Sequence, residues 1–201
     1  MIAIIDYGMG NLRSVEKAVQ SQGFEVKVSS DPGFVAEADK LILPGVGAFP
    51  DAMDNLEKTG LADIIIESVS RGKPLLGVCL GMQLLYELGL EIEEKKGLGF
   101  LKGRIEKLPP GLKIPHMGWN SINITENCKL LRGIENGSYM YFVHSYYAAG
   151  VSRDEVRAVS DYGVEIPAVV CSGKVYGTQF HPEKSGDRGI LIYKNFGELV
   201  E

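Results

Sequence analysis

The chain has 201 residues, of which 45% are hydrophobic and 23% charged, and this ordinary usage predicts a single globular domain spanning residues 1–201. The formal net charge of −5 comes from 21 basic and 26 acidic residues, with no run of five like charges, which argues against nucleic acid or a membrane surface as a partner. No apolar segment approaches the ~20 residues that a membrane-spanning helix needs.

Strand-like and helix-like segments alternate through the first half of the chain. Met1–Asp6 is predicted to be a buried strand and not a signal peptide, because no basic flank precedes its apolar residues and an acid ends them. A helix follows, with Asn11 as its candidate N-cap and Gly23 at its end. Further strands are expected at residues 24–28, 41–43 and 74–78, and helices at residues 51–59, 61–70 and 82–88. Such repeated units predict an α/β fold with a parallel sheet covered by helices on both faces.

The second half, from Gly97 onward, contains mostly strand patterns. Strands are expected at residues 100–108, 139–147 and 156–160, with a hairpin of residues 168–171 and 175–180. A terminal helix is expected at residues 190–200. This portion is predicted to be antiparallel or mixed and to extend the central sheet, so that the sheet as a whole is mostly parallel.

Two glycine turns follow predicted strands, at Gly8–Gly10 and Gly45–Gly47. A dinucleotide-binding turn needs a third small residue three places on, where this chain has Arg13 and Pro50, and no phosphate-binding P-loop sequence occurs. No nucleotide cofactor is therefore predicted. The Gly45–Gly47 turn ends a parallel strand, where its N–H groups could face an anion.

The most informative segment is Gly77-Val78-Cys79-Leu80-Gly81, between an apolar strand and a predicted helix. Two glycines flanking a central residue at this spacing are typical of a nucleophile elbow, since side chains there would collide with neighbouring strands. The turn projects Cys79 at the sheet edge and at a helix N-terminus, which favours the thiolate. The N–H of Leu80 would point toward a developing oxyanion. The alternative is that Cys79 is a buried small hydrophobe.

Three cysteines, without a C-x-x-C pair or an export signal, indicate free thiols in a reducing cytoplasm. No Cys/His spacing matches a zinc pattern, so no metal is predicted. Cys171 lies in an apolar run and is expected in the core, and Cys128 has no activating neighbour. Cys79 is therefore the candidate nucleophile.

A cysteine nucleophile needs a base that is oriented by a third group. His181-Pro182-Glu183 follows a predicted strand, and in an extended chain residues 181 and 183 project to the same side, so Glu183 can hold one imidazole nitrogen of His181. His144 has no neighbouring carboxylate, and His116 precedes a turn at Gly118. Both are interpreted as structural, and His181 is predicted to be the base.

With these motifs in place, the chain resembles the class I, or triad-type, glutamine amidotransferases over essentially its whole length. Four segments carry the resemblance in the family's order: residues 44–47, 77–83, 144–147 and 179–183. The resemblance implies that Cys79 attacks the side-chain amide of L-glutamine, that His181 is base and then acid, and that Glu183 orients it. Ammonia and glutamate would be released through a γ-glutamyl thioester, with no cofactor.

The resemblance also implies how the oxyanion and substrate are held. The oxyanion hole would comprise the Leu80 N–H and the backbone of Gly45, Val46 and Gly47. The head group of glutamine would be gripped by the side chain of Gln83 and the backbone of Ser145 and Tyr146, with Glu91 as a partner for its ammonium. The chemistry agrees, since losing one oxyanion donor costs on the order of 10²–10³ in rate.

Within the family, residues 6–11, residues 115–120 and Met82 resemble the members that supply ammonia to a separate (β/α)₈-barrel cyclase in histidine biosynthesis. The chain leaves no room for a synthetase domain, so a docked partner is expected to use the ammonia. Asn11, Trp119 and Lys184 are candidate interface residues. A core tryptophan and a solvated lysine are the alternatives for the last two.

Three other functions remain open from the sequence. The chain could be a glutaminase subunit of a chorismate-using synthase, although residues 115–120 favour the cyclase. It could be an elbow-cysteine α/β protein that does not use glutamine, although that group generally lacks the late His-Pro-Glu. It could also be a catalytically silent regulatory module.

Overall fold

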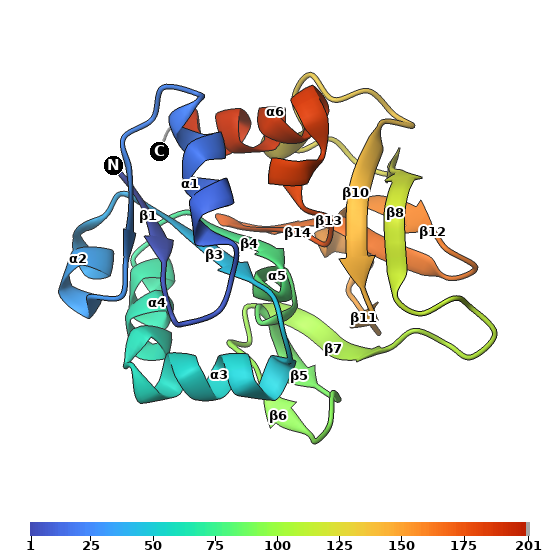
Figure 1. Ribbon diagram of the computed structural model, residues 1–201, viewed down its shortest axis with the longest axis horizontal. Helices are drawn as coiled ribbons and strands as arrows, with labels where there is room; N and C mark the ends of the chain where they lie inside the picture. The colour runs from blue at the N-terminus through green and yellow to red at the C-terminus, as the bar shows by residue number, and fades with distance from the viewer. Residues whose placement is uncertain (200–201) are drawn as a thin grey trace.

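The computed structural model describes residues 1–199, which fold around an eight-stranded sheet (Figure 1). The strands lie in the order β2-β1-β3-β4-β14-β13-β12-β9. Their bounds in that order are Val26–Ser29, Ile2–Ile5, Lys40–Gly45, Leu75–Cys79, Val175–Thr178, Glu165–Ser172, Val156–Asp161 and Asn123–Ile124. Pairing is parallel from β2 through β14 and antiparallel from β14 through β9. The predicted α/β fold with an antiparallel extension is confirmed.

Helices cover both faces of the parallel portion (Figure 1). Their bounds are α1 Leu12–Gln20, α2 Pro32–Glu37, α3 Phe49–Lys58, α4 Leu61–Ser70, α5 Leu80–Gln83 and α6 Gly186–Gly197. Alternate strand residues face opposite sides: Ile5 and Leu43 join a core with α2, α3 and α4, whereas Ile4 and Ile42 join a core with α1 and α6. The two cores fit the continuous apolar strands expected of a sheet buried on both faces.

Two smaller sheets complete the fold (Figure 1). One pairs β8 (His116–Ser121) with β10 (Tyr139–His144), and the other has the order β11-β7-β5-β6. The bounds of these four strands are Tyr146–Ala149, Leu101–Lys107, Tyr86–Gly89 and Lys95–Lys96. The expected strand 139–147 is therefore divided at Ser145 between two sheets.

The expected helix over residues 82–88 was wrong. Helix α5 ends at Gln83, and the chain enters β5 at Tyr86 to pair in parallel with Leu101 of β7. The apolar residues of this segment satisfy either pattern, and a pairing partner distant in sequence decides for the strand. The start of the first helix was placed correctly, but the Asn11 side chain makes no capping hydrogen bond.

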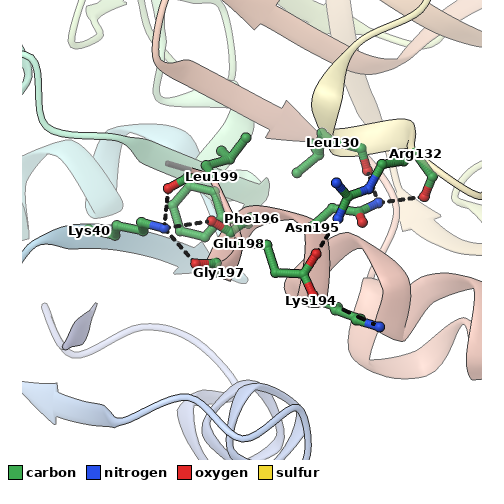
Figure 2. A network of polar contacts seen from close by, with 9 residues as sticks. All are labelled: Lys40, Leu130, Arg132, Lys194, Asn195, Phe196, Gly197, Glu198 and Leu199. Atoms are coloured by element: carbon green, nitrogen blue, oxygen red, sulfur yellow. Dashed lines mark hydrogen bonds and ion pairs between the residues drawn. The ribbon is translucent and has the colours of Figure 1, made fainter. Parts of the chain in front are cut away.

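The C-terminal helix is fixed at its end by polar contacts (Figure 2). The Lys40 ammonium, from the start of β3, donates to three carbonyl oxygens, those of Phe196, Gly197 and Leu199. The Asn195 amide donates to the carbonyls of Leu130 and Arg132 at 2.9 and 2.7 Å. A cation at a helix C-terminus satisfies otherwise unpaired carbonyls and complements the helix dipole. The expected helix at residues 190–200 instead spans Gly186–Gly197, and Val200 lies outside the described residues.

None of the helices in the described chain combines the length and apolar character needed to cross a membrane.

Candidate active site

Cys79 occupies a strained turn between β4 and α5. Its φ of 55° and ψ of −111° lie outside the regions that side-chain-bearing residues ordinarily adopt, which is the strain expected of a nucleophile elbow. The side chain is buried, and its sulfur lies 3.9 Å from both the Val143 carbonyl oxygen and the Gln179 amide nitrogen. The predicted elbow conformation is therefore present.

The two flanking glycines are required by close backbone contacts. A Cβ at Gly81 would lie 1.8 Å from the Leu43 carbonyl oxygen of β3, and one at Gly77 would lie 2.6 Å from the Gly81 carbonyl oxygen. Neither clash can be relieved by moving a side chain. The collision at Gly81 is with a neighbouring strand, as expected, whereas that at Gly77 is with the start of the following helix.

His181 and Glu183 form a buried hydrogen-bonded pair. His181 Nδ1 lies 2.9 Å from Glu183 Oε1, with side-chain exposures of 4% and 2%. Burial acts to lower the pKa of His181, but the hydrogen bonds and charges of Cys79 and Glu183 outweigh it and raise that pKa above its usual value. Burial likewise opposes ionisation of Glu183, but His181 holds the pKa of the carboxyl below its usual value.

The remaining ring nitrogen of His181 is available to the thiol. His181 Nε2 is buried and has no hydrogen-bond partner among the described residues, while Cys79 is close enough to raise the pKa of the ring. The His181–Glu183 contact was predicted correctly, but from the wrong geometry. Residues 182–184 form a 3₁₀ turn and not an extended segment, so the turn itself brings the two side chains together.

These groups border a cavity of about 340 Å³ at the carboxyl ends of the parallel strands, where open α/β sheets bind ligands. Most of the residues expected in the site contribute to its wall: Val46, Gly47, Cys79, Leu80, Gln83, Glu91, Ser145, Tyr146, His181 and Lys184. Glu183 lies behind His181, and Gly45 lies at the end of β3 beside Cys79. Segments far apart in sequence thus meet at one cavity.

The glycine turn after β3 is placed to contribute backbone donors. A Cβ at Gly45 would lie 2.5 Å from Tyr7 Oη, and one at Gly47, where φ is 110°, would lie 2.4 Å from Met9 Cε. In the structure described, the N–H groups of Val46 and Gly47 have no hydrogen-bond acceptor. Val46 is 45% exposed. The turn therefore presents free N–H groups beside the cavity, as does Leu80 at the first position of α5.

The segment Ser145–Tyr146 lies opposite the elbow at the edge strand β11. The Ser145 carbonyl accepts from Leu108 N at 3.0 Å, and the alternation of antiparallel pairs then turns the N–H and C=O of Tyr146 away from β7. The Tyr146 carbonyl accepts from Gln83 Nε2 and from His144 Nδ1, both at 2.9 Å. The carbonyl is saturated, whereas the Tyr146 N–H points away from β7, has no acceptor among the described residues and is free for a ligand.

Glu91 reaches the cavity from the segment after β5. Its Oε2 accepts from Phe49 N at 2.8 Å at the start of α3, where a carboxylate complements the helix dipole. Its place in the cavity wall agrees with the expectation, although one of its oxygens is already engaged.

The three candidate interface residues lie at the surface in different settings. Trp119 is 56% exposed and contacts the Tyr141 ring edge-on at a centroid distance of 6.1 Å, so it is not a core residue. Lys184 Nζ lies 5.8 Å from the centroid of the same ring and borders the cavity. Asn11 is exposed.

His116 and His144 are not paired with carboxylates. His116 Nδ1 lies 3.0 Å from His144 Nε2, in a buried strand pair and not before a turn. Burial lowers the pKa of His116 to about 4 and that of His144 to about 3. Burial also raises the pKa of Cys128 and of Cys171, which favours their thiol forms.

Three residues of the site were missed by sequence reasoning. Gln179 is fully buried and links Gln83 to Cys79. Tyr193 Oη donates to Glu183 Oε2 at 3.1 Å, and Ser185 Oγ donates to the His181 carbonyl at 2.6 Å. Gln179 begins the segment 179–183 that carries the family resemblance, but the segment alone assigned it no role. Among residues 1–199, no group of three or more His, Cys, Asp or Glu side chains could hold a metal ion.

Comparison with known proteins agrees with this geometry. The family model "Glutamine amidotransferase class-I" matches residues 3–198. The chain is 54% identical to "Imidazole glycerol phosphate synthase subunit HisH" of Caldanaerobacter subterraneus subsp. tengcongensis, over 100% of this chain and 99% of that protein. It is 53% identical to the Bacillus cereus protein of the same name, with 100% and 96% covered.

Solved structures agree on the fold. A crystal structure of a glutamine amidotransferase superposes with a TM-score of 0.77 at 22% identity, covering 96% of this chain and 97% of the other. A chain of PurLQS from Thermotoga maritima gives a TM-score of 0.76 at 22% identity, covering 97% and 96%. This chain belongs to the class I glutamine amidotransferase family.

Proposed function

We propose that the chain is the glutaminase subunit of an imidazole glycerol phosphate synthase. It hydrolyses L-glutamine to glutamate and ammonia, and a (β/α)₈-barrel cyclase uses the ammonia to make imidazole glycerol phosphate and AICAR in histidine biosynthesis. The observation that carries the chemistry is Cys79 beside the buried His181–Glu183 pair at one cavity. Full-length identity above 50% to the HisH subunits supports the choice of pathway.

The reaction begins with Cys79 and His181. His181 Nε2 accepts the thiol proton, and the resulting imidazolium is stabilised by the Glu183 carboxylate at Nδ1. The thiolate attacks the side-chain amide carbon of glutamine, and the imidazolium then protonates the departing nitrogen, which leaves as ammonia. His181 next takes a proton from water, whose oxygen attacks the γ-glutamyl thioester and releases glutamate.

The oxyanion formed in both attacks needs donors aimed at its position. The Leu80 N–H and the free N–H groups of the 45–47 turn supply them on this proposal. The Tyr146 N–H, which points away from β7 and has no acceptor among the described residues, donates to the substrate carboxylate on this proposal. Gln83 and Glu91 both lie in the cavity wall. On this proposal Gln83 helps to hold the head group of glutamine, and the Glu91 carboxylate accepts from its ammonium group.

A surface suited to a partner lies next to this cavity. Met117, Trp119 and Tyr139 are 62, 56 and 62% exposed on the β8–β10 pair, and large apolar side chains are enriched at protein interfaces. Trp119 contacts Tyr141, which contacts cavity-lining Lys184. We assign this surface, together with Asn11 and Lys184, to docking of the cyclase.

We also propose that the enzyme acts in the cytoplasm, which its three free thiols support.

The test is glutamine hydrolysis by the chain with and without the cyclase and its phosphoribulosyl formimino ribonucleotide substrate. Cys79→Ala should abolish hydrolysis and leave ammonia-dependent synthesis by the complex intact. Cys128→Ala is the matched control and should keep hydrolysis. Normal hydrolysis by Cys79→Ala, or no hydrolysis by the wild-type complex, contradicts the proposal.

A further inference from the structure

A continuous chain of hydrogen bonds runs from β8 to the sulfur of Cys79. It starts where Asn120 Nδ2 approaches His116 Nε2 at 3.4 Å and continues from His116 Nδ1 to His144 Nε2 at 3.0 Å. His144 Nδ1 meets the Tyr146 carbonyl at 2.9 Å. From that carbonyl the chain continues through two glutamine side chains to the nucleophile.

The Tyr146 carbonyl fixes the orientation of both glutamine amides. A carbonyl can only accept, so Gln83 must present its NH₂ group, which lies 2.9 Å away. The same NH₂ group donates to Gln179 Oε1 at 3.1 Å, so Gln179 must turn its oxygen toward Gln83. The Gln179 NH₂ group is thereby directed at the Cys79 sulfur, at 3.9 Å. The sulfur therefore has one amide donor, the Gln179 NH₂ group, beside the Val143 carbonyl oxygen, to which the neutral thiol can donate. Only the Gln179 donor can stabilise the thiolate, because a carbonyl oxygen cannot donate.

The same carbonyl fixes the protonation of the two histidines. Since His144 Nδ1 must carry a proton to donate to the carbonyl, its Nε2 is an acceptor in the neutral ring. His116 Nδ1 must then donate to it, which leaves His116 Nε2 to accept from Asn120. Asn120 spends its other N–H on the Asp161 carbonyl at 2.9 Å. The donor and acceptor roles of Asn120, His116 and His144 are therefore mutually consistent along this part of the hydrogen-bond series.

We propose that Gln179 is a catalytic residue that stabilises the Cys79 thiolate through its amide N–H, and that Asn120, His116 and His144 are positioning residues that hold the Tyr146 backbone in register. The use of that thiolate against glutamine rests on the proposed function. The hydrogen-bond chain itself does not, because alkylation of the sulfur measures it without glutamine.

Three further observations agree with this assignment. Gln179, Gln83, His116 and His144 are all at most 6% exposed, so the chain is shielded from water, which would otherwise compete for its bonds. Burial lowers the pKa of both histidines, which favours the neutral rings that the chain requires. His116 is also held between the Phe142 and Tyr162 rings, at centroid distances of 4.9 and 3.8 Å.

The first test concerns the sulfur. Gln179→Met keeps a side chain of similar length but has no N–H, so alkylation of Cys79 by iodoacetamide at neutral pH should slow about tenfold, because a hydrogen bond to a charged group is lost. Peptide mass spectrometry separates Cys79 from the other two cysteines. Ser160→Ala is the matched control. It removes a hydrogen bond from a buried serine to the Ser121 carbonyl, which is not part of the series of hydrogen bonds that leads to Cys79, and it should leave the alkylation rate unchanged. An unchanged rate in Gln179→Met overturns the proposal.

The second test concerns a residue that does not border the cavity. His116→Leu leaves His144 Nε2 without its donor, and the KM for glutamine of the cyclase complex should rise about fivefold, with a smaller change in kcat. His116→Asn should restore KM, because the asparagine Nδ2 can take the place of the imidazole Nδ1. A wild-type KM in His116→Leu, or no rescue by asparagine, contradicts the positioning role. If the leucine variant fails to fold, Gln179→Met still decides the proposal.

The experiments distinguish a failure of the proposed function from a failure of the role assigned to Gln179. A wild-type complex that hydrolyses no glutamine would refute the proposed function, while the alkylation rates would still show whether Gln179 acts on the sulfur.

Discussion

The histidines of this molecule occupy two environments that are almost equally buried but shift the pKa of the imidazole in opposite directions. His181 and His144 are 3 and 6% exposed, yet the pKa of His181 is raised and that of His144 is lowered to about 3. The difference lies in the neighbours: Cys79 and Glu183 both raise the pKa of His181, whereas His144 contacts a carbonyl and a second imidazole. Of these two buried imidazoles, only the one beside a thiol and a carboxylate is held in a setting that favours its protonated form, as a catalytic base requires.

Removing that carboxylate should have the largest effect. Glu183→Gln keeps the shape of the side chain but removes the carboxylate that, together with Cys79, raises the pKa of His181, so that pKa should fall. We expect kcat for glutamine hydrolysis to drop on the order of 10³ or more, by analogy with the loss of the orienting carboxylate in a catalytic triad. The measurement is kcat against pH in the cyclase complex. A kcat within about threefold of wild type would remove Glu183 from the mechanism.

Weakening the carboxylate indirectly should cost less. Tyr193→Phe removes the hydroxyl that donates to Glu183 Oε2 and leaves that buried oxygen without this donor. An unsatisfied buried group costs about 1–3 kcal/mol, so kcat should fall roughly tenfold while KM changes little. Tyr176→Phe is the matched control, because that tyrosine packs against Phe196 in the same core and not against Glu183. Equal activity of the two variants would contradict the assigned role of Tyr193.

Adding a carboxylate beside His116 should shift the pKa of that histidine upward, in the same direction as that of His181. Asn120→Asp places a carboxylate where an amide nitrogen now lies 3.4 Å from His116 Nε2. The pKa of His116 should rise by about one unit or more, because a neighbouring negative charge favours the imidazolium. Histidine titration by NMR measures the shift, with Asn127→Asp, at an exposed position, as the control. An unchanged titration of His116 would show that burial alone controls this ring.

The two kinds of histidine should also make the free energy of unfolding depend on pH in opposite directions. This is the smallest of the expected effects. His116 and His144 are neutral in the fold but protonate below about pH 6.5 when unfolded, so the free energy of unfolding should fall as pH drops from about 6.5 toward 4. His181, whose pKa is raised, contributes stability that is present below pH 6.5 and is lost as pH rises above it. Urea unfolding of wild type and His116→Leu near pH 7 and pH 5 measures the first effect. The variant should lose less stability on acidification, and an equal loss would contradict the assignment.

The candidate nucleophile and its candidate base could be located from the sequence because their signals are local. Glycines two places from Cys79 mark the elbow, and Glu183 stands two residues from His181. The physical reason was only partly right, since a 3₁₀ turn and not an extended chain brings the last two together. The α/β class was predictable for the same reason, because strand and helix patterns alternate along the first half.

The remainder depends on contacts between distant residues. Tyr86 enters a strand and not a helix because β7 lies beside it, and the role of Gln179 appears only when Gln83, 96 positions away in sequence, is placed next to it. The His116–His144 pair likewise joins two strands 28 residues apart. The exposure of Trp119 could not be read from its apolar character, which suits a core and an interface equally well.

The central claim, that Cys79 attacks glutamine, is tested most directly by trapping the nucleophile. A glutamine analogue with an electrophilic carbon in place of the side-chain amide should label the chain once in the presence of the cyclase and its ligand. Peptide mass spectrometry should find the label at Cys79, and excess glutamine should protect against it. Labelling at Cys128 or Cys171 instead, or labelling of Cys79 that glutamine does not slow, would contradict the account.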